Sequence, residues 1–241
     1  MATCPDCTTG CLLNGEPTGI ISTQGAYFAQ APGNYSLAIR LNCDVWIPDY
    51  FAGRPFMSAD DMALPPPAGA MTAISRWIRF ILIVIRGIPG LIRNRNSVVD
   101  ERLAKFIHTI QEERKYKKIG AVGYCFGGAA AIRAGSTDLI HTAVVCHPGR
   151  FTLDQVKAIK IPTSWVCAQE DMFFSDSFRN KVEAEFAQRK DGESFIDYEF
   201  QNLGTTHGFA IRPNLANPEL KESYQKAFEQ TVGWFNKTLV I

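Results

Sequence analysis

The segment from Lys118 to Arg133 constrains the fold more than any other part of the sequence. A short apolar run reaches a glycine-flanked cysteine, Cys125, and passes directly into an alanine-rich stretch. An apolar run of this length, bounded by charge and by glycine, is typical of a fully buried parallel strand. Gly123, Gly127 and Gly128 let the chain reverse sharply and let a helix pack close to the sheet. The segment therefore predicts a strand, a tight turn and a helix, with Cys125 at the apex of the turn.

The residues around Cys125 follow the pattern of a nucleophile elbow, Gly-x-Ser-x-Gly, with cysteine in place of serine. In that geometry the backbone N–H of Phe126 lies at a helix N-terminus and can stabilise an oxyanion. A lone cysteine is more often simply buried, since free cysteine is among the most buried residue types. The glycine setting favours a nucleophile, provided that a base and an orienting acid follow in the chain.

The rest of the chain alternates predicted strands with predicted helices. This alternation predicts an α/β fold with a doubly wound, mainly parallel sheet, and a single domain over residues 1–241 accounts for the length. Strands are expected at 44–51, 119–124, 142–146, 161–168 and 195–200, with an edge hairpin at 18–29, and helices at 98–117, 175–189 and 218–237.

Two further residues fall where the strands of such a sheet end. Asp171 follows the strand expected at 161–168, and His207 follows the strand at 195–200. Because the carboxyl ends of parallel strands meet in one crevice, we expect both side chains to lie beside Cys125. The order nucleophile, acid, histidine is that of α/β-hydrolases. His207 would accept the proton of the Cys125 thiol and Asp171 would orient His207, so that an acyl group forms on the sulfur and is then hydrolysed.

Other candidates for the same roles stay open at this point. Glu170 adjoins Asp171 and could serve as the acid. His147 is a rival base, but it ends a strand that precedes the acid, and a proline follows it, so we interpret it as a pocket wall or a substrate contact. His108 falls inside a helix pattern and His141 in a loop, and both are expected to be structural.

Composition excludes several classes of function. The net charge is +1, from 25 basic and 24 acidic residues, so no global field attracts nucleic acid or an anionic membrane. The first residues lack the charged and apolar regions of a secretory signal, which favours a cytoplasmic chain whose seven cysteines are thiols. We therefore expect no nucleic-acid partner.

Two segments resemble sites but lack essential parts. Cys4 and Cys7, with Cys11 nearby, have the spacing of half a zinc site, but no second pair of ligands follows, so no metal is expected. Residues 73–96 are strongly apolar, yet the uninterrupted run Phe80–Ile85 is far shorter than the roughly 18–20 residues of a membrane span. This segment is expected to form a short apolar helix that covers the core or a substrate pocket, rather than an interfacial anchor.

With these residues placed, the chain resembles the dienelactone hydrolase family, and within it the fungal branch. The resemblance covers nearly the whole chain and is carried by Cys4–Cys7, Asp44–Gly53, Val122–Gly128, Cys146–Pro148, Glu170–Asp171 and Thr206–Arg212. It implies an α/β-hydrolase fold, a triad of Cys125, His207 and Asp171, hydrolysis of lactones or activated small esters, and no cofactor. Arg212 matches an arginine that binds a substrate carboxylate, and Tyr124, His147 and Phe209 are expected with it in the substrate site.

The sequence departs from the family between Ala29 and Leu37. About twenty residues of a strand, a loop and a helix look absent there, and in the family that loop supplies the second oxyanion donor, worth roughly 10²- to 10³-fold in rate. The loss of a strand also exposes neighbouring strand edges. Two functions therefore remain: a cysteine hydrolase with an altered site, or a non-catalytic, truncated variant that binds a small molecule or a protein.

Overall fold

A parallel sheet forms the centre of the described structure. The computed structural model describes residues 20–21, 26–29, 41, 43–55, 85, 87–189, 196–211 and 216–239. The sheet has the order β4-β5-β6-β7, and each neighbouring pair is parallel. Its strands are β4 (Gly120–Cys125), β5 (Thr142–Pro148), β6 (Thr163–Glu170) and β7 (Tyr198–Thr206). Helices α6 (Phe126–Ala134), α7 (Leu153–Lys157) and α8 (Asp176–Ala187) lie in the connections between them.

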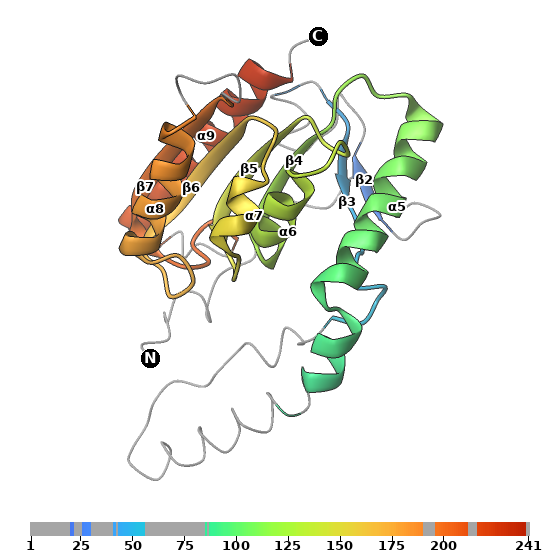
Figure 1. Cartoon of the computed structure of the whole chain (residues 1–241), viewed down its shortest axis with the longest axis horizontal. Coiled ribbons are helices and arrows are strands. Elements are labelled where there is room, and N and C mark those ends of the chain that lie inside the picture. Colours follow the sequence, from blue (N-terminus) through green and yellow to red (C-terminus); the bar gives the residue numbers. More distant parts are fainter. Residues whose placement is uncertain are drawn as a thin grey trace.

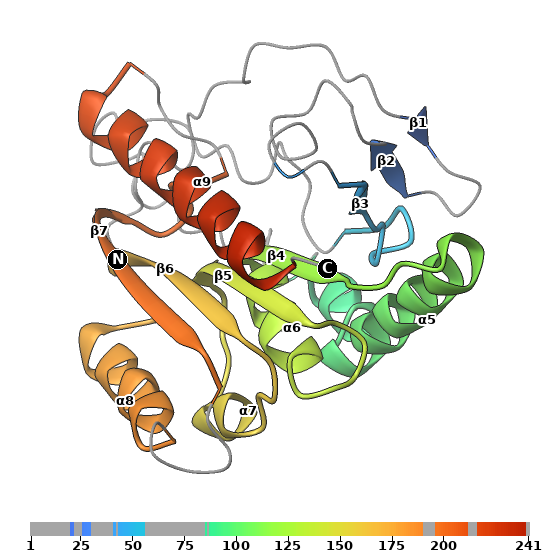
Figure 2. The same ribbon diagram turned by 90° about the horizontal axis from the view of Figure 1, so that it is seen from above.

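Helices cover both faces of this sheet. Figure 2 shows α9 (Pro218–Thr238) across one face and α6, α7 and α8 on the other. Because successive residues of a strand point to opposite faces, the two central strands feed two separate cores. Ala143, Val145, Trp165 and Cys167 pack with α6, α7 and α8, while Val144, Cys146, Val166 and Ala168 pack under α9. This is the doubly wound arrangement that the sequence predicts, and every residue of β5 is buried in it.

Helix α5 (Asn96–Arg114) leads the chain to β4. It lies beside α6 (Figure 1), and Asp100 accepts hydrogen bonds from Nε and Nη2 of Arg133, both at 2.8 Å. Val99, Ile107 and Ile110 form its buried side. The helix ends at Lys115, which adopts a left-handed conformation with φ 54°. The predicted helix at 98–117 is therefore present, with slightly shifted ends.

The strand predicted at 44–51 is shorter than expected and lies in a different sheet. β3 (Val45–Ile47) pairs antiparallel with β2 (Tyr27–Ala29), which pairs with β1 (Ile20–Ile21), so the predicted edge hairpin is present. β3 is held to the end of α5 by side chains. Trp46 Nε1 donates to the Tyr116 hydroxyl at 3.0 Å, and that hydroxyl donates to Asp44 at 2.5 Å.

Two local features of the structure differ from what the sequence predicts: the end of β7 and the helix α7. The strand predicted at 195–200 ends later than expected, because β7 continues to Thr206 and pairs there with Glu170 of β6. Helix α7 was not predicted, although its capping box is legible in the sequence. Thr152 and Gln155 exchange side-chain-to-backbone hydrogen bonds of 3.0 and 3.3 Å.

Of the apolar helix predicted at 73–96, residues 73–84 and 86 lie outside the described structure. For the described residues of this segment, the prediction that they cover the core is wrong. Residues 87–93 are helical, but the buried positions on this turn are Gly90 and Asn94. The apolar side chains face outward and are about half exposed: Ile85, Ile88, Leu91 and Ile92. Within the described ranges, none of the helices combines the length and the apolar character that crossing a bilayer requires.

Candidate active site

The turn at Cys125 has the backbone geometry of a nucleophile elbow. Cys125 ends β4 and precedes the first residue of α6, with φ 48° and ψ −115°. A non-glycine residue in such a conformation costs about 1–3 kcal/mol and persists only where the surrounding structure holds it. Here the backbone N–H of Gly149 donates to the Cys125 carbonyl at 2.7 Å, which ties the elbow to the end of β5.

Glycine is required on both sides of this turn because backbone atoms fill the space of a side chain. A Cβ at Gly123 would lie 2.2 Å from the carbonyl oxygen of Gly127. A Cβ at Gly128 would lie 3.0 Å from the Pro148 Cα. The close packing of α6 against β4 and β5 therefore depends on the two missing side chains, as the spacing in the sequence predicts.

His207 lies between Cys125 and Asp171. Its Nε2 is 3.1 Å from the Cys125 Sγ, and its Nδ1 is 2.8 Å from the Asp171 Oδ2. The other Asp171 oxygen accepts from the backbone N–H of Phe173 at 2.8 Å and of Phe174 at 3.2 Å. The Asp171 side chain is 1% exposed. Three side chains from the ends of three different strands are thus brought into one hydrogen-bonded row.

The rival acid lies on the other side of the strand end. Glu170 is exposed to solvent, whereas Asp171 turns inward to His207. The register explains this choice, because Glu170 is opposite Thr206 in the pairing of β6 with β7. The next residue of each strand, Asp171 and His207, then leaves the sheet on the same side.

The contacts of His207 outweigh the cost of burying its charge. Burial lowers the pKa of His207, but hydrogen bonds to Asp171 and Cys125 and their negative charges raise it to about 9. For Asp171, burial raises the pKa, and the hydrogen bond and charge of His207, with the two backbone N–H donors, hold the pKa below its ordinary value. A protonated His207 beside an ionised Asp171 is therefore the favoured state at neutral pH.

The rival base, His147, lies buried beside His207 and outside the hydrogen-bonded row. Its side chain is fully buried, and its ring packs edge-on against His207, with centroids 5.0 Å apart. Neither ring nitrogen has a hydrogen-bond partner among the residues that the structure describes. Burial, followed by the positive charge of His207, lowers the pKa of His147 to about 3. A neutral ring at this position adds no second positive charge beside His207.

The other expected site residues lie around this row. Phe126 is the first residue of α6, so its backbone N–H lies at the positive end of the helix. Tyr124 is half-buried and packs against the core under α9, as does the buried Phe209. Arg212 lies outside the described residues, as do Cys4, Cys7 and Cys11. No cluster of metal-binding side chains is found within the part of the chain that the structure describes.

Sequence reasoning missed three aromatic residues at the site. Phe173 packs edge-on against the His207 ring at 5.1 Å. Tyr50 and Phe51 pack against Phe126, with centroids 6.1 and 5.4 Å away. Tyr50 and Phe51 follow β3 after Pro48 and Asp49, so the proline that ends the strand was the sequence signal for a loop at this position.

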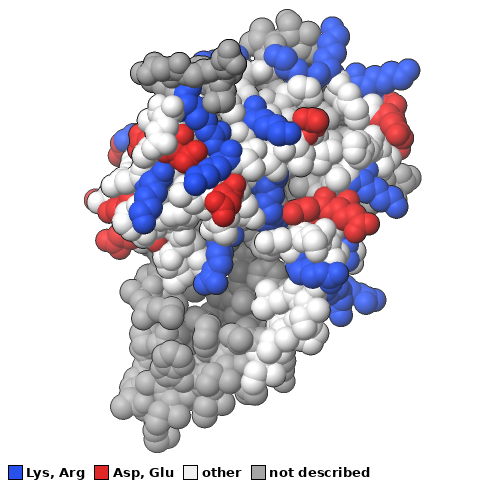
Figure 3. Space-filling view, viewed as in Figure 1, with Lys and Arg blue, Asp and Glu red and all other residues white. Residues whose placement is uncertain are grey.

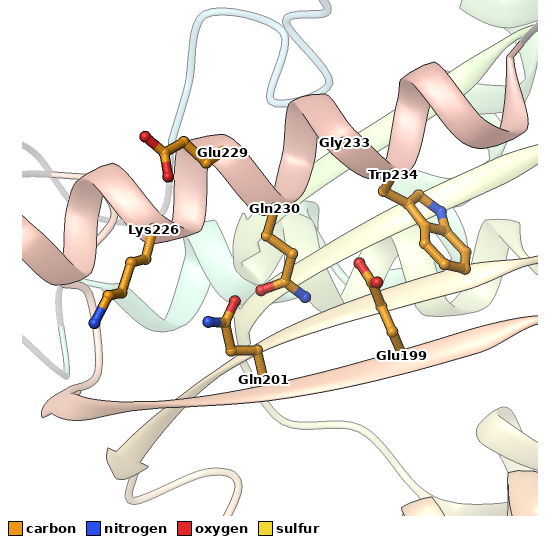
Figure 4. A pocket seen from close by; sticks show the side chains of 7 residues that line it. All are labelled: Glu199, Gln201, Lys226, Glu229, Gln230, Gly233 and Trp234. Atoms are coloured by element: carbon orange, nitrogen blue, oxygen red, sulfur yellow. The ribbon is translucent and has the colours of Figure 1, made fainter.

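A separate pocket lies between β7 and α9 (Figure 4). It is lined by Glu199, Gln201, Lys226, Glu229, Gln230, Gly233 and Trp234, none of which belongs to the row of Cys125, His207 and Asp171. Gln230 donates to the Ser164 hydroxyl at 2.9 Å, and that hydroxyl donates to Glu199 at 2.6 Å. These bonds hold α9 to the sheet, and we assign the pocket a structural role.

A parallel sheet with a nucleophile elbow, followed in the chain by an acid and a histidine, is the α/β-hydrolase arrangement. The model of the dienelactone hydrolase family matches residues 86–239. The chain therefore belongs to the dienelactone hydrolase family, which confirms the resemblance found in the sequence.

Two curated relatives are hydrolases by name. Hydrolase tropI of Talaromyces stipitatus is 33% identical over 147 residues, which is 58% of this chain and 54% of that protein. Hydrolase pyvD of Aspergillus violaceofuscus is 30% identical over 136 residues, which is 55% of this chain and 53% of that protein. The chain spans about half the length of the curated relatives it matches.

Solved structures of low sequence identity share the fold. A candidate dienelactone hydrolase from Klebsiella pneumoniae aligns over 88% of this chain and 92% of its own, with a TM-score of 0.57 and 11% identity. A dienelactone hydrolase-like promiscuous phosphotriesterase from metagenomic libraries aligns over the same fractions, with a TM-score of 0.51 and 16% identity. At these identities the likeness concerns the fold alone.

Replacing Gly123 by alanine should destabilise the elbow. The added Cβ would meet the backbone of Gly127 at 2.2 Å, so we expect a loss of about 2–4 kcal/mol in the free energy of unfolding, measured with urea. Gly204→Ala is the matched control, because its nearest contact would be an ordinary 3.6 Å to the Gln169 side chain. Equal stability of the two variants would contradict the close packing at the elbow.

Replacing Asp171 by asparagine should return the pKa of His207 from about 9 toward its ordinary value near 6.5, because the amide supplies no negative charge. An NMR titration of the His207 ring measures the shift. Folding raises this pKa, so protonated His207 stabilises the folded state below about pH 6.5, and this contribution is lost as the pH rises through about 9.

The Asp171→Asn variant should therefore lose less stability than the wild type between those two pH values. Asp138→Asn, at an exposed loop position, is the control, and the His207 ring of this variant should titrate as in the wild type. A His207 ring that titrates identically in wild type and Asp171→Asn would show that the carboxylate is not what raises its pKa.

Proposed function

We propose that the chain is a cysteine hydrolase of lactones or small carboxylic esters, with Cys125 as nucleophile, His207 as base and Asp171 as the residue that orients the base. The observation that carries the proposal is the position of His207, within hydrogen-bonding distance of both the sulfur and the carboxylate. The elbow supports it, because Cys125 is half-buried at the carboxyl end of β4, where substrate can approach.

The reaction follows from these positions. With the proton on His207, the Cys125 sulfur attacks the substrate carbonyl carbon, and the carbonyl oxygen takes the electron pair as an oxyanion near the Phe126 N–H. The bond from carbon to the alkoxy oxygen then breaks, and His207 protonates the leaving oxygen. In a lactone this oxygen stays attached to the acyl group through the opened ring.

Water completes the cycle. His207, now neutral, accepts a proton from a water molecule that attacks the thioester carbon. The carbon–sulfur bond breaks, the carboxylic acid leaves, and the sulfur keeps the electron pair of that bond. His207 carries the proton taken from water, so the pair returns to the state in which the reaction began. Asp171 stabilises the protonated form of His207 in both halves of the reaction, as its buried and fully hydrogen-bonded carboxylate allows.

A second function is supported by the shortened stretch before Leu37. β4 pairs with β5 on one side, and no strand in the described part of the chain pairs with its other edge. A chain that lacks a strand and a donor loop could bind a small molecule or a protein without catalysis. The hydrolase is the better supported function because the row of three side chains is intact.

We also propose that the protein works in the cytoplasm. Cys43, Cys125, Cys146 and Cys167 are free thiols, which suits a reducing compartment and a thiol nucleophile. Basic and acidic side chains are interspersed on the face in Figure 3, in keeping with a small-molecule substrate rather than a nucleic-acid partner.

Cys125→Ala should abolish esterase turnover. With a p-nitrophenyl ester or a dienelactone, we expect a fall of at least about 10³-fold in kcat, because the acyl group has no atom on which to form. Mass spectrometry of the wild type should find the acyl group on Cys125. Cys43→Ser removes a half-buried thiol away from His207 and should keep full turnover. Equal inertness of wild type and Cys125→Ala would leave the non-catalytic function.

Arg212→Ala should discriminate between substrates. We propose, from the family motif, that Arg212 pairs with a carboxylate of an anionic substrate. The variant should then raise KM for a carboxylated lactone by about 10-fold or more, and should leave KM for a neutral ester nearly unchanged. Equal changes for the two substrates would contradict an anionic substrate class.

A further inference from the structure

We propose that the hydroxyl of Tyr50 is a catalytic group that donates the second hydrogen bond to the oxyanion, opposite the backbone N–H of Phe126. This proposal rests on the proposed hydrolase function and names a donor in place of the loop that the sequence is expected to lack. It also gives a role to the segment after β3, which sequence reasoning did not assign.

The loop that carries Tyr50 is fixed at the elbow by hydrogen bonds and ring packing. The Tyr50 carbonyl accepts from Arg102 Nη1 at 3.1 Å, and Asp49 accepts from the backbone N–H of Gly53 at 2.6 Å. The Tyr50 ring stacks on Phe126 with an interplanar angle of 28°. A side chain held in this way is preorganised, which is what a donor to a transition state requires.

The hydroxyl lies over the first turn of α6. It is 3.4 Å from the point where a Cβ would sit on Gly127, two residues after Cys125 in the chain. Tyr50 is half-buried, and its side chain makes no hydrogen bond with any other described residue, so within that part of the chain its O–H is an uncommitted donor. Glycine at 127 leaves open the space in front of this hydroxyl.

The electrostatics agree with this placement. Burial raises the pKa of Tyr50, the negative charge of Cys125 raises it further, and Arg133 lowers it in part. The phenol keeps its proton throughout the pH range in which His207 titrates, so it can donate a hydrogen bond without transferring the proton.

Two other polar side chains near the row are less suited to the role. His147 is fully buried, so its ring nitrogens are closed to a substrate in this conformation. Tyr124 packs against the core under α9. Tyr50 is the side chain that combines a rigid position, an uncommitted donor and partial exposure at the elbow.

The experiment compares two reactions of the same sulfur in wild type and Tyr50→Phe. Hydrolysis of a p-nitrophenyl ester passes through an oxyanion, whereas alkylation of Cys125 by iodoacetamide does not. Phenylalanine keeps the ring stacked on Phe126 and removes the donor. We expect kcat for the ester to fall about 10²- to 10³-fold and the alkylation rate to stay within about twofold. Tyr198→Phe removes a tyrosine hydroxyl on β7 and should change neither rate.

Each other outcome overturns the proposal in a distinguishable way. Unchanged ester hydrolysis in Tyr50→Phe would show that the hydroxyl stabilises no oxyanion. A parallel loss of hydrolysis and alkylation would show that Tyr50 maintains the shape of the site instead. A wild type that alkylates but does not turn over ester would contradict the proposed function itself and would remove the Tyr50 role with it.

Discussion

The positive φ of Cys125 is the constraint on which the rest of the site depends. The chain must stop extending as a strand and start a helix within one residue, which places the sulfur above the sheet rather than inside a core. The strain, about 1–3 kcal/mol, is offset by the burial of β5 and α6 on both sides of the turn. The absence of side chains at Gly123 and Gly128 is what allows that packing.

The rings of His147 and His207, with centroids 5.0 Å apart, have pKa values shifted in opposite directions. His207 has a buried carboxylate and a thiol as partners, and the pKa of its ring is raised to about 9. The ring nitrogens of His147 have no such partner among the described residues, and burial lowers the pKa of the ring to about 3. A second imidazolium would repel the first and weaken its pair with Asp171. The neutral His147 therefore packs closely against His207 without placing a second positive charge beside it.

The sequence predicted the elements whose signals are local. The elbow was predictable because its glycines are steric requirements, and Asp171 and His207 were placed because parallel strands end at one edge. The end of β7 was missed because Gly204 and Thr206 have turn-like composition, and only pairing with β6 keeps them extended. The sequence did not predict that β3 pairs in an antiparallel sheet, or that Ile88, Leu91 and Ile92 are exposed. Hydrophobicity alone does not say which strand pairs with β3, or whether an apolar side chain packs on the core.

The residues before and after position 86 contribute to the site in different ways. The match to the family model begins at residue 86, and the elements that place Cys125, Asp171 and His207 all lie after that point. The described residues before 86 include no strand of the parallel sheet, so their side chains can contact the elbow only from outside that sheet. In the described part of the chain, the loop after β3 does so through the rings of Tyr50 and Phe51 on Phe126. In the proposed reaction, stabilisation of the transition state therefore depends on a short surface loop, whereas the position of Cys125 depends on the buried sheet.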